Sequence, residues 1–199
     1  MSPLKTDLYL KTIDLRRYCP KSTAILPEES AGKTCLDDCP FLTSRQIKAC
    51  KLAIGARSYL PSGPPITVPQ PIEPDLICLN EPDENSLVLV SGNSRVTLDV
   101  LLTVWSQGIT PAYLLPVDCL GHTVDMAMVF GEFKPERLKR ALQRTGLETK
   151  VAHRRMVVPG LTASLAADFA GATGWEIEVG PVCAAELPLF LGERWAFPG

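Results

Sequence analysis

The stretch from Leu87 to Leu102 reads LVLVSGNSRVTLDVLL. Its first four residues are apolar and favour extended backbone, which predicts a buried strand over Leu87–Val90. The letters SGN that follow are a turn signal, and the apolar residues beyond them recur at helical spacing, which predicts a helix over Arg95–Gln107. A strand that turns directly into a helix is the repeating unit of an α/β fold.

The rest of the chain repeats this alternation of strand and helix. Further strands are predicted in PAYLLPVDCL, ending at Asp118, over Arg155–Val158 and over Glu176–Val179. Further helices are predicted in KPERLKRALQRTG, with Pro135 in its first turn and Gly146 as its stop, over about Leu161–Phe169 and over about Val182–Leu191. The segment TVDMAMVFGEF is compatible with a strand or a short helix. The pattern predicts a Rossmann-like α/β fold, with a parallel sheet flanked by helices.

Composition sets the class of protein. The chain has 199 residues, of which 46% are hydrophobic, enough for one full domain and a smaller appendage. A net charge of -2 and the lack of any strong Lys/Arg run argue against a nucleic-acid partner. No apolar run approaches the ~20 residues that span a bilayer, and the first residues lack a signal-peptide core. We therefore expect a cytoplasmic protein without a membrane partner.

The seven cysteines are unevenly distributed along the chain. Reducing compartments keep thiols free, so seven cysteines in a cytosolic protein indicate a metal, a cluster or buried thiols. Four of them lie in the first quarter, and a proline-rich stretch follows. We therefore predict three parts: a cysteine-rich module over 1–60, a semi-rigid linker over 61–75 and an α/β domain over 76–199.

The four N-terminal cysteines are candidate metal ligands: Cys19, Cys35, Cys39 and Cys50. Four thiolates suit one 4Fe-4S cluster, and Cys-Pro pairs such as those at Cys19 and Cys39 are common beside cluster ligands. A zinc site accepts the same residues. The intervals of fifteen, three and ten residues match no motif closely, so a cluster, a zinc ion and no metal all stay open.

The loops that follow the four predicted strands are the places to expect a ligand, because open α/β sheets bind ligands at the carboxyl ends of their strands. These loops read SGNSR, VDCLGHT, VPGLT and VGPVC, and each contains glycine. They lack phosphate-binding motifs and, apart from Arg95, basic residues, which disfavours a nucleotide. No nucleophile lies beside a base in sequence. A neutral ligand and ordinary turns both fit.

Ordered blocks over Leu87–Arg194 carry a family resemblance: SGNSRVT, PAYLLPVDCLG, FGEFKPERLKRALQRTGLETKVAHRRMVVPG, GWEIEVGP and AAELPLFL. They resemble the C-terminal corrinoid-binding domain of the large (gamma) subunit of the corrinoid iron-sulfur protein of the acetyl-CoA synthase/CO dehydrogenase system. AGKTCLDDCPFLTSRQ and PSGPPITV resemble the end of that subunit's iron-sulfur module. The family's tight C-x-x-C is absent, and so is the TIM barrel that the family inserts between the two modules.

The resemblance implies a corrinoid whose own base does not bind the cobalt. The family's Asn and Thr pattern falls on Asn93 and Thr97, and the Thr lies by the lower face of the cobalt. The implied cofactor-binding residues are Gly92, Asn93, Thr97, Asp118, Gly121, Pro159, Gly160, Gly180 and Pro181. A threonine cannot donate to cobalt as an imidazole does, which favours the low-coordinate Co(I) state.

The function that follows from the resemblance is a methyl carrier of one-carbon metabolism, with cobalt cycling between Co(I) and methyl-Co(III). The implied N-terminal cluster reactivates the cobalt by reduction. Such a protein is a methyl-transfer component rather than a stand-alone enzyme. Because the barrel is missing, a methyltransferase, a TIM-barrel partner or self-association is expected to cover the corrin face. The alternative is a cofactor-free interaction or assembly partner of a corrinoid methyl-transfer system.

Overall fold

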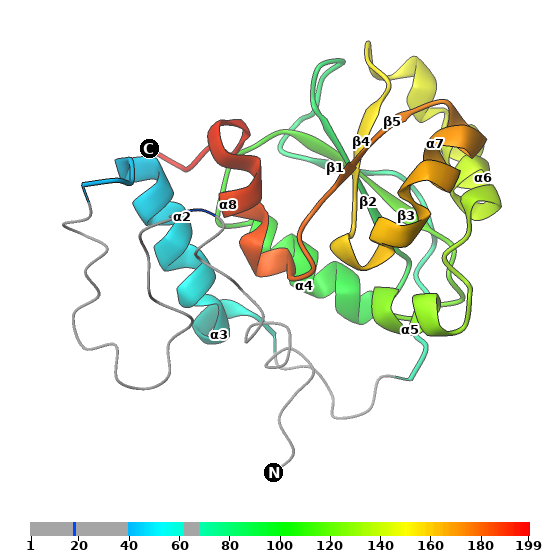
Figure 1. The fold of residues 1–199 in the computed structure, drawn as a ribbon, viewed down its shortest axis with the longest axis horizontal. Helices are drawn as coiled ribbons and strands as arrows, with labels where there is room; N and C mark the ends of the chain where they lie inside the picture. The colour runs from blue at the N-terminus through cyan, green and yellow to red at the C-terminus, as the bar shows by residue number, and fades with distance from the viewer. Residues whose placement is uncertain (1–17, 19–39, 62–67) are drawn as a thin grey trace.

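The computed structural model describes Tyr18, residues 40–61 and residues 68–199. Five strands of the described chain form one sheet in the order β1-β3-β2-β4-β5 (Figure 1). They are β1 (Ile77–Leu79), β2 (Leu87–Gly92), β3 (Ala112–Val117), β4 (Arg155–Val158) and β5 (Glu176–Val179). All pairs from β3 to β5 are parallel, whereas β1 runs antiparallel to β3 at one edge. The predicted α/β class is confirmed.

Helices cover both faces of this sheet (Figure 1). The α-helices are α2 (Ser44–Ile54), α3 (Ala56–Tyr59), α4 (Arg95–Trp105), α5 (Val124–Val129), α6 (Pro135–Thr145), α7 (Ala166–Thr173) and α8 (Leu187–Leu191). Short 3-10 turns are η2 (Leu147–Thr149), η3 (Gly160–Leu165), η4 (Ala184–Glu186) and η5 (Gly192–Arg194). Helices α5, α6 and α7 contribute to the core on one face, and α4 and α8 to the core on the other. No helix in the described ranges could span a membrane.

The central strand β2 contributes side chains to the hydrophobic cores on both faces of the sheet. Val88 and Val90 pack on the α6–α7 face, whereas Leu89 packs on the α4–α8 face. Alternate residues of a strand point to opposite faces, and a strand buried on both sides is therefore apolar throughout. Each such side chain stabilises the fold by about 1.5–3 kcal/mol. The residues of Leu87–Val90 are all apolar because the strand is buried on both sides.

The predicted elements agree closely with the structure where the local signal is strong. Strands β4 and β5 have the predicted bounds, and Gly146 ends α6 in the left-handed conformation with φ 61°. The ambiguous TVDMAMVFGEF segment forms helix α5, as its alanine and methionines favour. The predicted helix over 161–169 divides into η3 and α7. Strand β1 was not predicted.

Helix α2 packs against α8 and η4, on the outer side of the α/β domain (Figure 1). A capping box between Thr43 and Gln46 starts the helix, with mutual hydrogen bonds of 3.2 and 2.9 Å. Cys50, only 2% exposed, lies in the same buried cluster as Cys183. The described part of the predicted cysteine module is therefore in direct contact with the domain, while the predicted boundaries stay a prediction.

The end of the proline-rich segment is fastened to the loops at the carboxyl edge of the sheet. The amide of Gln70 donates to the Gly121 carbonyl at 3.1 Å, and the amide of Ile72 donates to the Asn93 carbonyl at 2.9 Å. Pro71 forms an isolated bridge with Ser94. These bonds join three segments that are far apart in the sequence.

Candidate functional site

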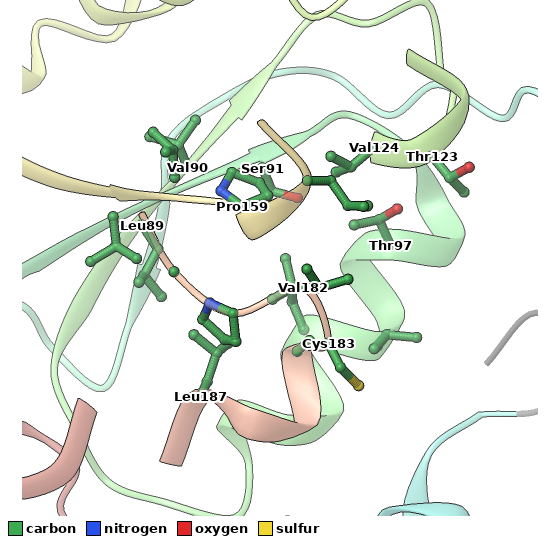
Figure 2. Close-up of a pocket in the computed structure, with 18 of the residues that line it drawn as sticks. Leu89, Val90, Ser91, Thr97, Thr123, Val124, Pro159, Val182, Cys183 and Leu187 are labelled. Atoms are coloured by element: carbon green, nitrogen blue, oxygen red, sulfur yellow. The ribbon is translucent and has the colours of Figure 1, made fainter. Parts of the chain in front are cut away.

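A largely apolar pocket of about 180 Å³ opens at the carboxyl edge of the sheet (Figure 2). Its walls come from the end of β2, the first turns of α4 and α5, the loop after β4 and the segment from Gly180 to Leu187. The one charged side chain among the lining residues is Asp125, whose carboxylate accepts a hydrogen bond from Thr123. The pocket therefore suits an uncharged, mainly apolar group.

Four of the predicted cofactor-binding residues line this pocket: Thr97, Pro159, Gly180 and Pro181. Thr97 lies in the first turn of α4 and is partly exposed. Figure 2 shows it on the same side of the pocket as Thr123. Its hydroxyl makes no hydrogen bond to another residue of the described chain, and is therefore open to a ligand.

Gly160, another predicted residue, holds two of the pocket loops together. Its amide donates to the Pro181 carbonyl at 2.9 Å. A Cβ atom at this position would lie 2.7 Å from the Gly180 oxygen, the Pro181 carbonyl carbon and the Val182 nitrogen. Only glycine allows this approach of two backbones. The loops after β4 and β5 therefore form one rigid side of the pocket.

Asn93, another predicted cofactor-binding residue, lies beneath the loops of the site. It is 2% exposed and does not line the pocket. Its Oδ1 accepts from the amides of Cys119 at 2.8 Å and Gly121 at 3.1 Å, and its Nδ2 donates to the Ile72 carbonyl at 3.1 Å and to Asp118 Oδ1 at 3.5 Å. Both polar atoms of its side chain are engaged within the protein. Asn93 connects the loops beneath the site.

Gly92 and Gly121 lie beside this asparagine and outside the pocket lining. Gly121 has φ 76°, and a Cβ there would lie 2.3 Å from the nitrogen of Pro71. A Cβ on Gly92 would meet the His122 oxygen at 3.4 Å. Gly121 therefore allows the loop after β3 to approach Pro71 closely, whereas a side chain at Gly92 would make an ordinary van der Waals contact.

The charges near the loop after β3 are paired with one another. Arg137 donates to the Asp118 carbonyl at 2.6 Å, lies 3.8 Å from the Asp118 carboxylate and forms an ion pair with Glu132. Arg137 is only 18% exposed, so solvent screens these interactions incompletely. Asp118 therefore stabilises the loop after β3 through its contacts with Arg137 and Asn93. Like Asn93, it does not line the pocket.

Sequence reasoning missed Ser91 and the segment from Val182 to Ala184, which line the pocket. Ser91 is 2% exposed, and its Oγ has no hydrogen-bond partner in the described chain. A buried hydroxyl without a partner costs about 1–3 kcal/mol. The sequence feature that could have identified this residue is a polar serine at the end of an otherwise apolar strand. Val182, 41% exposed, belongs to a segment that was predicted as helix.

Two buried thiols flank the site. Cys119 lies under Gly92, and Cys183 lines the pocket. Burial raises the pKa of Cys119 to about 12 and the pKa of Cys183 to about 11. Both thiols are therefore neutral at physiological pH and are poor nucleophiles.

These thiols make the fold sensitive to alkaline pH. In the unfolded chain they lose their protons near pH 9, whereas in the folded chain they keep them up to pH 11 to 12. The free energy of unfolding is therefore expected to decrease from pH 8 to pH 10, by about 1 kcal/mol per thiol. Urea unfolding at both pH values measures the decrease. Cys119→Ala should reduce it, and Cys78→Ala, at an exposed position, should leave it unchanged.

The predicted metal ligands lie mostly outside the described residues, namely Cys19, Cys35 and Cys39. Cys50 lies in α2, buried in the contact with α8 and η4. Among the residues that the structure places, no three His, Cys, Asp or Glu side chains gather as a metal site. The iron-sulfur prediction therefore rests on the sequence.

The fold and site define an α/β protein with an apolar ligand pocket at the carboxyl edge of its sheet. The family model of the CO dehydrogenase/acetyl-CoA synthase delta subunit matches residues 55–191. The chain therefore belongs to this family. The match begins after the four N-terminal cysteines and includes every residue of the pocket.

Proteins similar to this chain include a subunit of an acetyl-CoA decarbonylase/synthase complex and a corrinoid/iron-sulfur protein subunit. The chain is 37% identical over 123 residues to the acetyl-CoA decarbonylase/synthase complex subunit gamma of Methanopyrus kandleri, covering 62% of this chain and 27% of the relative. It is 32% identical over 123 residues to the corrinoid/iron-sulfur protein large subunit of Moorella thermoacetica, covering 62% of this chain and 28% of the relative. The chain thus spans about a quarter of the length of these relatives.

Proposed function

We propose that this domain binds a corrinoid at the pocket and serves as a methyl carrier of one-carbon metabolism. The observation that carries the proposal is the apolar pocket at the carboxyl edge, lined by Thr97, Pro159, Gly180 and Pro181. The name of the Moorella relative, a corrinoid/iron-sulfur protein, supports the same cofactor. Bound corrinoid supplies a cobalt that accepts and releases a methyl group, and the protein binds and orients it.

The residues present fit such a cofactor. The pocket offers apolar walls for an uncharged organic group. One buried hydroxyl in its lining, that of Ser91, has no hydrogen-bond partner in the described chain. Thr97, whose hydroxyl bonds no other residue of the described chain, would be among the residues that hold the corrinoid. The lining residues within the described chain include no histidine. His122 instead contacts Phe130, with ring centroids 4.9 Å apart and the ring planes tilted by 42°. A corrinoid held by these residues would supply a nucleophilic Co(I), since a hydroxyl is a weaker donor to cobalt than an imidazole.

A protein partner fits the surface beside the pocket. Leu120, Val129 and Phe130 are 51%, 75% and 56% exposed. Leu120 lies in the loop after β3, Val129 is the last residue of α5, and Phe130 is the C-cap of that helix. Exposed apolar side chains gathered in one region mark interaction surfaces. The relatives are named as subunits of a complex, and we propose that a methyltransferase, a TIM-barrel protein or a second copy covers the corrin face here.

The proposed iron-sulfur cluster on Cys19, Cys35, Cys39 and Cys50 would supply the electron that returns inactive cobalt to Co(I). Its test is direct: anaerobic reconstitution followed by absorbance and iron analysis. About four irons per chain are expected if these four thiolates bind one 4Fe-4S cluster. A colourless protein without iron contradicts the cluster.

Corrinoid binding is tested by anaerobic reconstitution with aquocobalamin, gel filtration and cobalt analysis. The expected result is one cobalt for each chain. Val182→Asp places a charge in the apolar wall at a partly exposed position, and is expected to weaken binding at least about tenfold because the carboxylate loses hydration. Ile109→Asp is the matched control, since Ile109 is 54% exposed and lies outside the pocket lining.

Two results would contradict the proposal. The first is a wild-type chain that leaves the column without cobalt under all conditions. The second is equal weakening by Val182→Asp and Ile109→Asp, which would show that binding does not depend on the pocket. Removal of the hydroxyl in Thr97→Ala should additionally change the absorbance bands of the bound corrinoid, since Thr97 would be among the residues that hold the cofactor and the protein tunes its electronic properties.

A further inference from the structure

A second pocket, of about 350 Å³, lies at the opposite edge of the sheet from the apolar pocket. Its lining includes Ser86, Pro111 and His153, which shortly precede β2, β3 and β4, together with the first residues of β2 and β4. These three strands are parallel, so their amino ends meet at one edge. The two pockets share one lining residue, Val157. The amino-edge pocket is therefore a separate site.

The amino-edge pocket combines an apolar floor with a polar rim. Its buried lining residues include Val88, Met156 and Val157, which belong to the two hydrophobic cores of the domain. Arg155 and Asn85, by contrast, are exposed at its rim. A cavity of about 150 Å³ holds a benzene ring in an engineered protein. The amino-edge pocket is therefore large enough for a ring that carries a polar group.

The two carboxylates of this pocket already have partners within the protein. Glu178 accepts two hydrogen bonds from Arg194, at 2.6 and 2.7 Å. Asp83 accepts from the Ser86 hydroxyl at 2.7 Å and from the Asn85 amide at 3.0 Å. These hydrogen bonds, the one from Ser86 above all, lower the pKa of Asp83. Both carboxylates are therefore ionised and satisfied, and their charge disfavours a ligand with more than one negative charge.

Three hydrogen-bond donors of the same pocket, by contrast, have no acceptor in the described chain. Arg155 lies opposite Glu176 in the register of β4 and β5, yet no ion pair joins them. The side-chain amide of Asn85 likewise bonds no described residue. Thr110 is 3% exposed, and its Oγ accepts from the Ala196 amide at 2.6 Å, which leaves its proton to donate. The group that complements this pocket is therefore an acceptor.

We propose that the amino-edge pocket is a binding site for a small organic acid, whose carboxylate accepts from Arg155 and Thr110. Arginine presents its donors in a planar fork that matches a carboxylate, and such charge-assisted bonds are about twice as strong as neutral ones. The apolar part of the acid contacts Val88 and Met156. The site does not depend on the proposed corrinoid function, because it lies at the other edge of the sheet.

Three probes test the chemistry of this site in the full chain: benzoate, benzamide and inorganic phosphate. Benzoate and benzamide share one shape, but only benzoate is charged, whereas phosphate is charged and lacks an apolar part. Wild-type protein is expected to bind benzoate at least about tenfold more tightly than either of the others. Calorimetry measures the dissociation constants. Amide NMR shifts on benzoate addition are expected at Val88 and Arg155.

Arg155→Gln tests the proposed contact, and it is expected to weaken benzoate binding at least about tenfold and to remove the preference over benzamide. Arg95→Gln is the matched control. Arg95 is the other arginine of the described side chains without a side-chain partner, and it is exposed in the first turn of α4, outside the amino-edge pocket. Both substitutions change the net charge equally at exposed positions, and urea unfolding checks that both variants fold.

Four outcomes would overturn the site. They are equal affinity for benzoate and benzamide, phosphate binding as tight as that of benzoate, equal weakening by Arg155→Gln and Arg95→Gln, and NMR shifts confined to the lining of the apolar pocket. The result is also distinguishable from the corrinoid proposal. A chain that binds no cobalt but binds benzoate in a manner that depends on Arg155 supports this site and contradicts the corrinoid function alone.

Discussion

Replacing Gly160 with alanine is expected to lower the free energy of unfolding by about 3 kcal/mol and to remove ligand binding at the pocket. The new Cβ would lie 2.7 Å from backbone atoms of Gly180, Pro181 and Val182. Backbone atoms cannot move aside as the end of a flexible side chain can. The loops after β4 and β5 must separate, and the hydrogen bond from the Gly160 amide to Pro181 is lost.

Gly171→Ala is the matched control for this substitution. Gly171 lies inside α7, and a Cβ atom there meets nothing within 4 Å. Alanine is favoured over glycine in a helix by about 1 kcal/mol, so this variant should be as stable as wild type or more so. Urea unfolding measures both variants. Equal stability of Gly160→Ala and wild type would show that the two loops are not in close contact.

Asn93→Ala is expected to have the second large effect, a loss of about 3 kcal/mol or more of unfolding free energy. The substitution leaves the amides of Cys119 and Gly121 and the carbonyl of Ile72 without the partners that Asn93 provides. Each buried group without a partner costs about 1–3 kcal/mol. The loop after β3 should lose its order, and amide hydrogen exchange at Cys119 and Gly121 should accelerate.

Asn85→Ala tests whether this loss comes from the hydrogen bonds or from any asparagine substitution. The backbone amide of Asn85 bonds Asp83 at 3.0 Å, and the residue is exposed, so truncation of its side chain should change stability by less than about 0.5 kcal/mol. If Asn93→Ala also stayed within this range, its side chain would not be the connection between the three loops.

The sequence predicted the parallel part of the fold because its signals are local. The Arg155–Val158 and Glu176–Val179 strands are short apolar or alternating runs bounded by turns, and Gly146 follows the last periodic residue of α6. Strand β1 has only three residues, and its pairing with β3 joins positions more than thirty residues apart. Nothing in ICL alone distinguishes such a strand from an extended linker.

Some residues of the candidate site could likewise be predicted from the sequence, whereas the roles of others depend on distant contacts. The family resemblance placed Thr97 and Pro159 in the site, and both lie shortly after parallel strands, whose carboxyl ends meet at one edge of the sheet. The internal role of Asn93 depends on partners that lie 21 to 28 residues away, and no local pattern reveals them. The unsatisfied state of Ser91 appears only once its neighbours are placed. Sequence patterns locate the edge of the sheet, while packing decides which side chains face the pocket.

The hydrogen bonds that hold the end of the proline-rich segment against the sheet bear on where a longer protein of this family can accept an insertion. Leu60 lines the pocket on one side of residues 62–67, and on the other side Gln70 and Ile72 bond the loops beside it. Both flanks are thus anchored independently of the chain between them. Additional sequence inserted at this point would begin and end at the mouth of the pocket without disturbing the sheet. A longer connection at this point would therefore place a whole new domain beside the pocket.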